Sequence, residues 1–413
     1  MTTSLEATDR YLVVSSDGHA GGDLLDYRPY LATRWHDDFD AWAAAYENPF
    51  ADLMQATAYR NWDSGRRLAE QDADGIAAEV LYPNTVPPFF AQGNLVATPP
   101  TPADYPRRWA GLQAHNRWLV DFCAQAPERR AGIIQVFLND VDDAVAELRE
   151  LAPRMQVCGG VLLPSVSPNA GLHELWDPYY EPLWEVCEEL DLPINVHGGS
   201  GLPDYGDLPA ARAIMLIELP WFAHRALWHL MFGGVFDRHP GLRVAQTEQG
   251  VAWIPRGLET LDWFHGRMTT GGAAEALFFG AVADSMSLTP SEYFAKHVWV
   301  GASFLRRSEA DLIPAIGADR IMWGHDYPHS EGTFPYSTEA LRVAFAGLAA
   351  ADVTRMVGET AAAFYGFDTA ALRPLADRIG PEVATVAQPL AFSDYPTDST
   401  CNAFERDYIM RAW

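Results

Sequence analysis

The sequence has few cysteines, few basic residues and no long apolar run. Its four cysteines (Cys123, Cys158, Cys187 and Cys401) form no C-x-x-C pair, so we expect reduced, structural thiols. No stretch approaches eighteen uninterrupted apolar residues, and residues 1–10 are polar. We therefore expect neither a membrane segment nor a signal peptide, and the sequence predicts a cytoplasmic protein.

Basic residues are outnumbered almost two to one. Lys and Arg total 29 against 55 Asp and Glu, which gives a formal net charge of -26. Such a surface repels nucleic acids and anionic membranes, so neither is an expected partner, whereas a small-molecule substrate is. An anionic substrate would need cations inside its pocket, and a metal ion would reverse the local field there. Apolar residues make up 48% of the chain, enough for one large core.

Short apolar, β-branched runs alternate with segments of helical spacing. The eight candidate strands are Tyr11–Ser16, Ile76–Tyr82, Ala131–Phe137, Val157–Leu163, Leu192–Val196, Leu242–Thr247, His297–Ala302 and Arg320–Gly324. The intervening helical segments include Val141–Leu151, Tyr179–Leu190, Ala210–Phe232 and Glu309–Ile316. This alternation predicts parallel βαβ units, and eight of them favour a closed (β/α)8 TIM barrel over an open doubly wound sheet.

Three stretches exceed the minimal repeat, near residues 21–74, 83–106 and 271–292. Because loops after the strands build the active-site face of a barrel, we expect insertions over its mouth. The barrel is predicted to span residues 1–366. Residues 367–413 are predicted to form a C-terminal extension whose aromatics Phe404, Tyr408 and Trp413 dock on the barrel or on a partner. We expect a homo- or hetero-oligomer formed through the insertions and this extension.

Polar residues gather where predicted strands end. Asp17 and His19 follow the first strand two residues apart, so on an extended segment both side chains point to one side. An isolated Asp-x-His is more often a turn aspartate and a surface histidine. Here, however, His197 ends the fifth strand, and Asp326 follows the eighth beside two histidines, one of them His329. Strand ends of a barrel meet on one face, which predicts a shared metal site.

Three further residues are candidate metal ligands. Glu248 ends the sixth strand, where a role on or next to the metal is favoured over a structural ion pair. Glu79 lies within its strand, and the two roles are equally supported there. His115 lies in the predicted helix Arg107–Cys123 and would reach the mouth only if that helix began above the rim, so a solvated histidine is favoured. Glu248 and His329 are also the candidate general acids or bases.

Five motifs together resemble the amidohydrolase superfamily, in the branch that includes aminocarboxymuconate-semialdehyde decarboxylase. They are Ser16-Asp17-Gly18-His19, Asn116-Arg117-Trp118-Leu119 before Pro127-Glu128-Arg129, Asn195-Val196-His197-Gly198-Gly199, Phe236-Asp237-Arg238-His239-Pro240-Gly241-Leu242, and Trp323-Gly324-His325-Asp326-Tyr327-Pro328-His329. The resemblance covers most of Tyr11–Gly366. It implies a distorted (β/α)8 barrel with a metal held by Asp17, His19, His197 and Asp326.

The sequence departs from this branch in three places. Glu248 stands where the decarboxylases carry a histidine used as an acid or base, so proton transfer by that imidazole is not implied. The fourth strand, Val157–Leu163, offers no Lys or Glu to bridge two metals as in the urease-like branch. The closing Asn-Ala-Ala-Arg-Leu-Tyr-Gly pattern is replaced by residues Thr360–Gly366, Thr-Ala-Ala-Ala-Phe-Tyr-Gly.

Three functions fit these residues. The first is metal-dependent hydrolysis or non-oxidative decarboxylation of a small carboxylated molecule. The second is O2-dependent hydroxylation of a small amino or carboxylic acid at a dinuclear iron or manganese–iron site, which a resemblance to the subgroup with 2-aminoisobutyrate hydroxylase allows. The third is a non-catalytic partner subunit. One or two divalent ions are expected, and the carboxylate-rich ligands favour manganese or iron over zinc.

Overall fold

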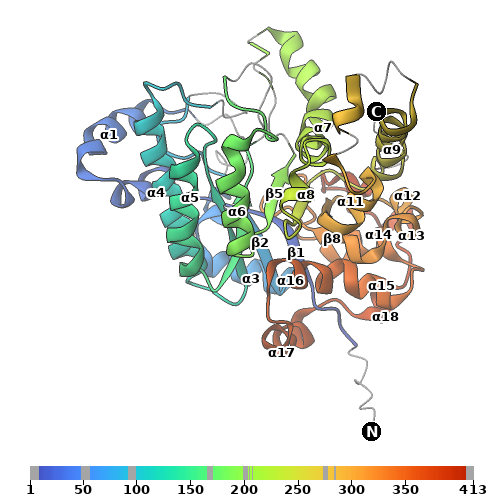
Figure 1. Cartoon of the computed structure of the whole chain (residues 1–413). Coiled ribbons are helices and arrows are strands. Elements are labelled where there is room, and N and C mark those ends of the chain that lie inside the picture. The colour runs from blue at the N-terminus through green and yellow to red at the C-terminus, as the bar shows by residue number, and fades with distance from the viewer. Residues whose placement is uncertain are drawn as a thin grey trace.

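Eight parallel strands form one sheet in the order of the sequence (Figure 1). The computed structural model describes residues 9–47, 56–91, 99–164, 171–198, 203, 205–206, 208–272, 278–282 and 285–405. The strands are β1 (Val14–Ala20), β2 (Ala78–Pro83), β3 (Arg130–Gln135), β4 (Val157–Leu162), β5 (Ile194–His197), β6 (Val244–Thr247), β7 (Val298–Ser303) and β8 (Ile321–Gly324). All eight predicted strands and the predicted barrel are confirmed.

The first strand extends further than the sequence indicated. It was expected to end at Ser16, but β1 continues to Ala20, so Asp17 and His19 lie within the strand. Its pairing with β2 changes register between Ser15 and Gly18. Every residue of β1 is buried. The apolar run ends at Ser16, but the strand itself continues through Asp17 and His19 into the barrel mouth.

The barrel closes between β8 and β1 through an irregular seam. The backbone amide of His19 donates to the carbonyl of Tyr327 at 2.7 Å, and that of Asp326 donates to the carbonyl of Asp17 at 3.0 Å. Gly18 forms a single parallel bridge with Tyr327. The chain after β8 therefore replaces regular pairing with individual hydrogen bonds. This is the distortion of the barrel, and it brings Asp326 beside Asp17.

Helices follow the strands and cover the outside of the barrel (Figure 1). Their bounds are α1 (His36–Ala45), α3 (Ser64–Asp74), α4 (Tyr105–Cys123), α5 (Val141–Leu151), α6 (Glu181–Glu189), α7 (Pro209–Phe232), α8 (Val235–Arg238), α9 (Ile254–Thr270), α11 (Pro290–His297), α12 (Arg307–Ala310), α13 (Ile313–Ile316), α14 (Ser337–Phe345), α15 (Ala350–Thr354), α16 (Thr360–Tyr365), α17 (Thr369–Ile379) and α18 (Val383–Val386). The prediction of one helix over Glu309–Ile316 is wrong. Pro314 has no amide hydrogen and lies in the first turn of the second of two short helices.

The local sequence explains the helix that was predicted most accurately. Asp140 caps α5 by accepting hydrogen bonds from the amides of Asp142 and Asp143. Ala144, Leu148 and Leu151 repeat at helical spacing and are buried against the barrel. They belong to one continuous apolar core between strands and helices, which also contains Leu227 and Trp323.

The described part of the C-terminal extension packs on the barrel. Tyr11 donates its amide to the carbonyl of Pro381, which ties residues before β1 to the extension. Further along, Cys401, Ala403 and Phe404 form an apolar cluster with Ala340 and Val343 of α14. Tyr408 and Trp413 lie outside the described residues, as do parts of the three predicted insertions. The four cysteines are free thiols. Among the described helices, none is both long and apolar enough to cross a membrane.

Candidate metal centre

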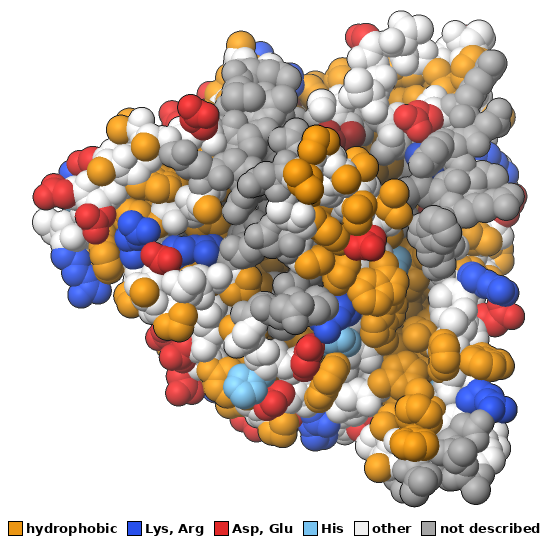
Figure 2. All heavy atoms as spheres, turned by 90° about the horizontal axis from the view of Figure 1, so that it is seen from above, with side chains coloured by type: hydrophobic (Ala, Val, Ile, Leu, Met, Phe, Trp, Pro, Cys, Tyr) orange, Lys and Arg blue, Asp and Glu red, His pale blue; other side chains and the backbone are white. Residues whose placement is uncertain are grey.

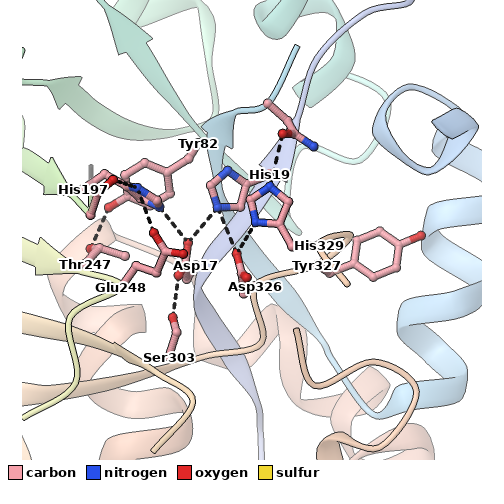
Figure 3. A network of polar contacts seen from close by, with 12 residues as sticks. Asp17, His19, Tyr82, His197, Thr247, Glu248, Ser303, Asp326, Tyr327 and His329 are labelled. Atoms are coloured by element: carbon pink, nitrogen blue, oxygen red, sulfur yellow. Dashed lines mark hydrogen bonds and ion pairs between the residues drawn. The ribbon is translucent and has the colours of Figure 1, made fainter. Parts of the chain in front are cut away.

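Asp17, His19 and Asp326 meet at the seam between β1 and β8 (Figure 3). The Nε2 atom of His19 lies 3.3 Å from Oδ1 of Asp17 and 3.0 Å from Oδ1 of Asp326. Both carboxylates are fully buried, and the His19 side chain is 4% exposed. The two carboxylates therefore face the same imidazole nitrogen.

His197 joins this group from the end of β5. Its Nε2 atom lies 3.5 Å from Oδ1 of Asp17, and its Nδ1 atom lies 3.3 Å from Oε2 of Glu248. One potential ligand atom each of Asp17, His19 and His197 lies within 4.8 Å of the other two. Four of the predicted ligands, Asp17, His19, His197 and Asp326, thus converge as the sequence predicted, with Glu248 beside them.

The donor atoms fit a cation. The Nδ1 atoms of His19 and His197 face the backbone carbonyls of Pro83 at 3.3 Å and Gly198 at 2.9 Å. A ring that donates from Nδ1 presents the lone pair of Nε2, which is the ligand form of histidine. Within the described part of the chain, both Nε2 atoms, Oδ1 of Asp17 and Oδ2 of Asp326 are buried without a hydrogen-bond partner. Buried polar atoms of this kind need a partner, and one cation can satisfy the atoms of Asp17, His19 and His197, which form one group within 4.8 Å.

The electrostatics of the cluster point the same way. Burial opposes ionisation of Asp17, but the imidazoles of His19 and His197 that face its carboxylate hold its pKa well below the usual range. Burial also opposes protonation of His197, yet the charges of Glu248 and Asp17 raise its pKa to about 9. The carboxylates therefore draw positive charge onto the imidazoles. A divalent cation can supply that charge in place of protons.

A second group of donors adjoins the first. Ligand atoms of Glu248, Asp326, His329 and Glu331 lie within 4.8 Å of one another. The Nδ1 atom of His329 is 2.9 Å from Oδ1 of Asp326, and its Nε2 atom is 3.1 Å from Oδ1 of Asn84. A His329 ring that is protonated on both nitrogens can donate a hydrogen bond to each of these two oxygens. Burial opposes this protonation, but Asp326 raises the pKa of His329 to about 10.

Glu248 and Asp326, which both come after strands, have an unusual backbone conformation. Glu248 follows β6 with φ 61°, and Asp326 follows β8 with φ 56°. Residues other than glycine rarely adopt this left-handed conformation, which is strained and frequent at functional sites. Gly198 provides the space for Glu248, because a Cβ there would lie 2.8 Å from its Oε2. Burial raises the pKa of Glu248 to about 7, with Asp326 and Asp17 adding and His197 opposing.

The structure does not bring Glu79 into the cluster. Its oxygens accept two hydrogen bonds of 2.7 Å from the guanidinium of Arg67, and both side chains are fully buried. Arg130 lies 3.9 Å away, and His325 lies 4.0 Å away. The Glu79 carboxylate therefore forms a buried ion pair with Arg67. Of the two roles that the sequence left open, the contacts favour the structural one.

His115 is also away from the cluster. It lies in α4, is fully buried, and its Nδ1 faces Gln135 at 3.1 Å. Its ring stacks on Tyr27, and burial lowers its pKa to about 3. The expectation of a solvated histidine is wrong, because residues before α1 cover this face of α4.

Several residues that support the cluster were not singled out from the sequence. Ser303 donates a hydrogen bond to Oδ2 of Asp17. The ring centroids of Tyr82 and His197 lie 4.5 Å apart, and the Tyr82 hydroxyl donates a hydrogen bond to the Thr247 hydroxyl. Ser303 directly follows the predicted seventh strand, so the strand-end rule used for His197 indicates it too. No comparable signal marked Tyr82, which lies inside a strand.

A pocket opens beside Glu248. Its cavity volume is about 430 Å3. It is lined by Glu248, Gln249, Gly250, Ala252, Ser303, Phe304, Arg306, Ser308, Glu309, Asn402 and Glu405. Arg306 donates from Nε to the carbonyl of Asn402 at 3.2 Å, and its Nη2 lies 3.6 Å from Glu405. The C-terminal extension thus forms one wall of this pocket, and Arg306 brings a positive charge into it.

Together, an eightfold parallel barrel and a cluster of carboxylates and imidazoles at its strand ends define a candidate metal-dependent barrel enzyme. The sequence pattern of the family described as amidohydrolase matches residues 33–367. The chain therefore belongs to the amidohydrolase family. This confirms the resemblance inferred from the five motifs and the prediction that the chain is an enzyme.

Curated relatives are about a quarter identical to this chain over the aligned residues. A γ-resorcylate decarboxylase of Rhodococcus jostii is 27% identical over 223 residues, which cover 52% of this chain and 64% of that protein. A 2-amino-3-carboxymuconate-6-semialdehyde decarboxylase of Dictyostelium discoideum is 26% identical over 278 residues, which cover 66% of this chain and 68% of that protein.

Solved structures share the fold. A 5-carboxyvanillate decarboxylase of Novosphingobium aromaticivorans, in complex with manganese and 4-hydroxy-3-methoxy-5-nitrobenzoic acid, has a TM-score of 0.65 and 21% identity, covering 89% of this chain and 99% of that one. A dihydroxybenzoic acid decarboxylase of a Polaromonas species, with manganese and 2-nitroresorcinol, has a TM-score of 0.59 and 18% identity, covering 88% of this chain and 99% of that one. These likenesses concern the barrel.

Proposed function

We propose that this protein is a manganese-dependent, non-oxidative decarboxylase of a small aromatic carboxylate. The observation that carries the proposal is the convergence of Asp17, His19, His197 and Asp326, whose buried donor atoms face one another at the barrel mouth. Carboxylate and imidazole ligands suit manganese. The decarboxylase names of the relatives and the manganese in the neighbouring structures support the reaction and the metal.

The metal, once bound by these four residues, would polarise an oxygen of the substrate. The pocket beside Glu248 would hold the substrate ring, and Arg306 would attract its carboxylate against the overall negative charge of the chain. A rim formed by Asn402 and Glu405 would limit the size of the ring's substituents. The C-terminal extension would then contribute to substrate choice.

Decarboxylation breaks the bond between the ring carbon and the carboxylate carbon, and the ring carbon must receive a proton as CO2 leaves. Glu248 is placed to hold this proton on Oε2, since it reaches into the same pocket and lies 3.3 Å from His197. A carboxyl group with a pKa near 7 is a suitable acid at neutral pH. His329, which stands on the other side of Asp326, is the second candidate acid.

The proposal is tested by anaerobic turnover. The full chain is purified without added metal, loaded with manganese or zinc in parallel, and mixed with 2,6-dihydroxybenzoate or 5-carboxyvanillate in the absence of oxygen. We expect CO2 release with manganese, its loss on chelation, and its recovery when manganese is restored. The matched variant His197→Ala should release no CO2. A chain that binds manganese but decarboxylates neither compound contradicts the proposed reaction.

The same experiment separates the alternatives. The relatives named above give no support to O2-dependent hydroxylation or to a non-catalytic subunit. The second group of donors, around Glu331, could hold another ion, and elemental analysis counts the ions bound per chain. Two redox metals per chain, together with turnover only in oxygen, would replace decarboxylation by hydroxylation. One manganese per chain and oxygen-independent turnover would exclude hydroxylation.

A further inference from the structure

Polar side chains cross the inside of the barrel, although hydrophobic side chains gather at the end of the molecule that Figure 2 shows. Tyr82 on β2, Asn195 on β5, Thr247 on β6 and Tyr365 on α16 are each at most 5% exposed. The Tyr82 hydroxyl oxygen lies 2.7 Å from the Thr247 hydroxyl oxygen and 3.3 Å from Oδ1 of Asn195. The Tyr365 hydroxyl donates a hydrogen bond to the same Oδ1 at 2.9 Å. We refer to these four residues as the cross-barrel network.

The network connects strands on opposite sides of the barrel. Tyr82 is paired with His19 between β2 and β1. Thr247 is paired with His197 between β6 and β5. Because the eight strands follow the order of the sequence, β2 lies opposite β6 and β1 lies opposite β5. The hydrogen bond between Tyr82 and Thr247 therefore spans the barrel beside the two imidazoles of the candidate metal centre.

The ring of Tyr82 packs against both imidazoles (Figure 3). Its centroid lies 4.5 Å from the centroid of the His197 ring and 5.8 Å from that of the His19 ring. The two imidazole centroids lie 4.9 Å apart, with the ring planes at 90°. Rings in contact at such distances restrict one another's rotation. A change in the position of Tyr82 would therefore alter the directions in which both Nε2 atoms point.

The hydroxyl of Tyr82 acts as a neutral hydrogen-bonding group. Burial raises its pKa well above the usual value of 10, and the neighbouring Tyr365 and Asp17 add to this effect. The phenol therefore keeps its proton at neutral pH and does not compete for a cation as a phenolate. The network also gives a role to two motif positions that metal binding does not explain, namely Asn195 in the fifth-strand motif and Tyr365 in the closing pattern Thr360–Gly366.

We propose that Tyr82, anchored by the cross-barrel network, is a positioning residue that sets the spacing and orientation of His19 and His197 for manganese. This inference rests on the manganese site proposed above. Because Thr247 directly precedes Glu248 in the chain, the same hydrogen bond restrains the backbone that carries the candidate acid. Groups that orient metal ligands without touching the metal typically change metal affinity about 10- to 100-fold when they are lost. Loss of the Tyr82 hydroxyl should therefore weaken manganese binding, with turnover falling as a consequence.

Titration of the metal-free full chain with manganese tests this role. Tyr82→Phe and Thr247→Val each remove one hydroxyl of the hydrogen bond and nearly keep the size of the side chain. Tyr180→Phe is the matched control, because Tyr180 is also fully buried and its hydroxyl donates to the carbonyl of Leu138 at 3.2 Å, outside the network. We expect Tyr82→Phe and Thr247→Val each to raise the manganese dissociation constant about tenfold or more, and Tyr180→Phe to leave it unchanged. The double variant should bind no worse than the weaker of the two single variants, because both substitutions remove the same hydrogen bond.

Three results would overturn the proposal. One is a folded Tyr82→Phe chain that binds manganese as tightly as the wild type. Another is an equal weakening in Tyr82→Phe and Tyr180→Phe, which would show that loss of any buried tyrosine hydroxyl has the same effect. The third is a double variant in which the two losses add.

Thermal melting establishes which variants fold. If Tyr82→Phe does not fold, Thr247→Val decides the question, since an unchanged manganese affinity contradicts the role of the hydrogen bond. A wild-type chain that binds manganese but releases no CO2 refutes the proposed reaction alone, because the dissociation constants still test Tyr82.

Discussion

Removal of the Arg67 guanidinium is the sharpest test of how the barrel mouth is built. Arg67 and Glu79 are both fully buried and form two parallel hydrogen bonds of 2.7 Å. The same guanidinium donates to the carbonyl of His19 at 2.8 Å and lies over the ring of Tyr327. Arg67→Met keeps the length of the side chain but leaves the Glu79 carboxylate without its main partner. We expect severe destabilisation.

The magnitude follows from two independent considerations. Burial opposes ionisation of Glu79, but the charge and hydrogen bonds of Arg67 lower its pKa from 4.5 to about 2. This difference corresponds to roughly 3 kcal/mol. Loss of one partner from a buried ion pair typically costs about 3–5 kcal/mol. Arg67→Met should therefore lower the free energy of unfolding by about 3 kcal/mol or more. Arg67→Met with Glu79→Leu should recover part of it, because no unpaired carboxylate remains.

Urea unfolding measures the stabilities, and elemental analysis measures manganese in each variant. Glu79→Gln should lose stability but bind as much manganese as the wild type, since Glu79 lies outside the ligand cluster. A Glu79→Gln variant with normal stability and no manganese would refute the structural role and return Glu79 to the ligands. A double variant less stable than Arg67→Met alone would refute the argument from the unpaired charge.

Three further predictions concern the metal and the pocket. His197→Ala should abolish manganese binding and turnover, as measured by elemental analysis and CO2 release; retained binding would remove His197 from the ligands. Burial lowers the pKa of His197 and His329, but Glu248 and Asp326 respectively raise these values to about 9 and 10. Protonation of these two imidazoles therefore adds fully to the free energy of unfolding below about pH 6.5. This contribution is lost as the pH rises through the two folded-state pKa values. Manganese requires neutral ligand imidazoles, so its effect on the melting temperature should grow from pH 6 to pH 9; a pH-independent effect would contradict this. Arg306→Gln should raise KM for 2,6-dihydroxybenzoate about tenfold or more, while Arg307→Gln, exposed nearby, should not; equal effects would exclude Arg306 as the carboxylate contact.

The sequence predicted the strands and the main cluster because both follow short-range rules. Alternating β-branched runs and helical spacing located all eight strands, and strand ends in a barrel must meet on one face. This rule placed Asp17, His197 and Asp326 together. The same rule applies to Ser303, which directly follows the seventh strand, but a serine at that place carries no chemical signal by itself.

The errors arose where contacts between distant segments decide the structure. Glu79 and Arg67 are twelve residues apart on a strand and a helix, and no local pattern indicates that their side chains pair inside the barrel. His115 is covered by Tyr27, about ninety positions earlier in the chain. The extension's contribution to the pocket through Asn402 also depends on how residues far apart in sequence pack. Such pairings require a tertiary structure.

Glu248 offers the most direct test of the reaction itself. It is the acid closest to His197 on the pocket side, and its strained backbone at φ 61° holds the side chain over the cluster. Glu248→Gln keeps the size of the side chain and removes the transferable proton, so turnover should fall about 10²–10⁴-fold. Glu248→His should retain more turnover than Glu248→Gln, because an imidazole can also deliver a proton there. Glu189→Gln, at an exposed glutamate at the end of α6 outside this pocket, is the control and should change turnover little.

Manganese content separates this role from metal binding. If Glu248 is the acid alone, Glu248→Gln binds one manganese per chain like the wild type, and the pH dependence of turnover loses the ionisation near pH 7. If turnover and manganese disappear together, Glu248 is a ligand, and the proton must come from another group such as His329. Unchanged turnover in Glu248→Gln would exclude both roles, because a carboxamide can neither deliver the proton nor replace a charged ligand oxygen.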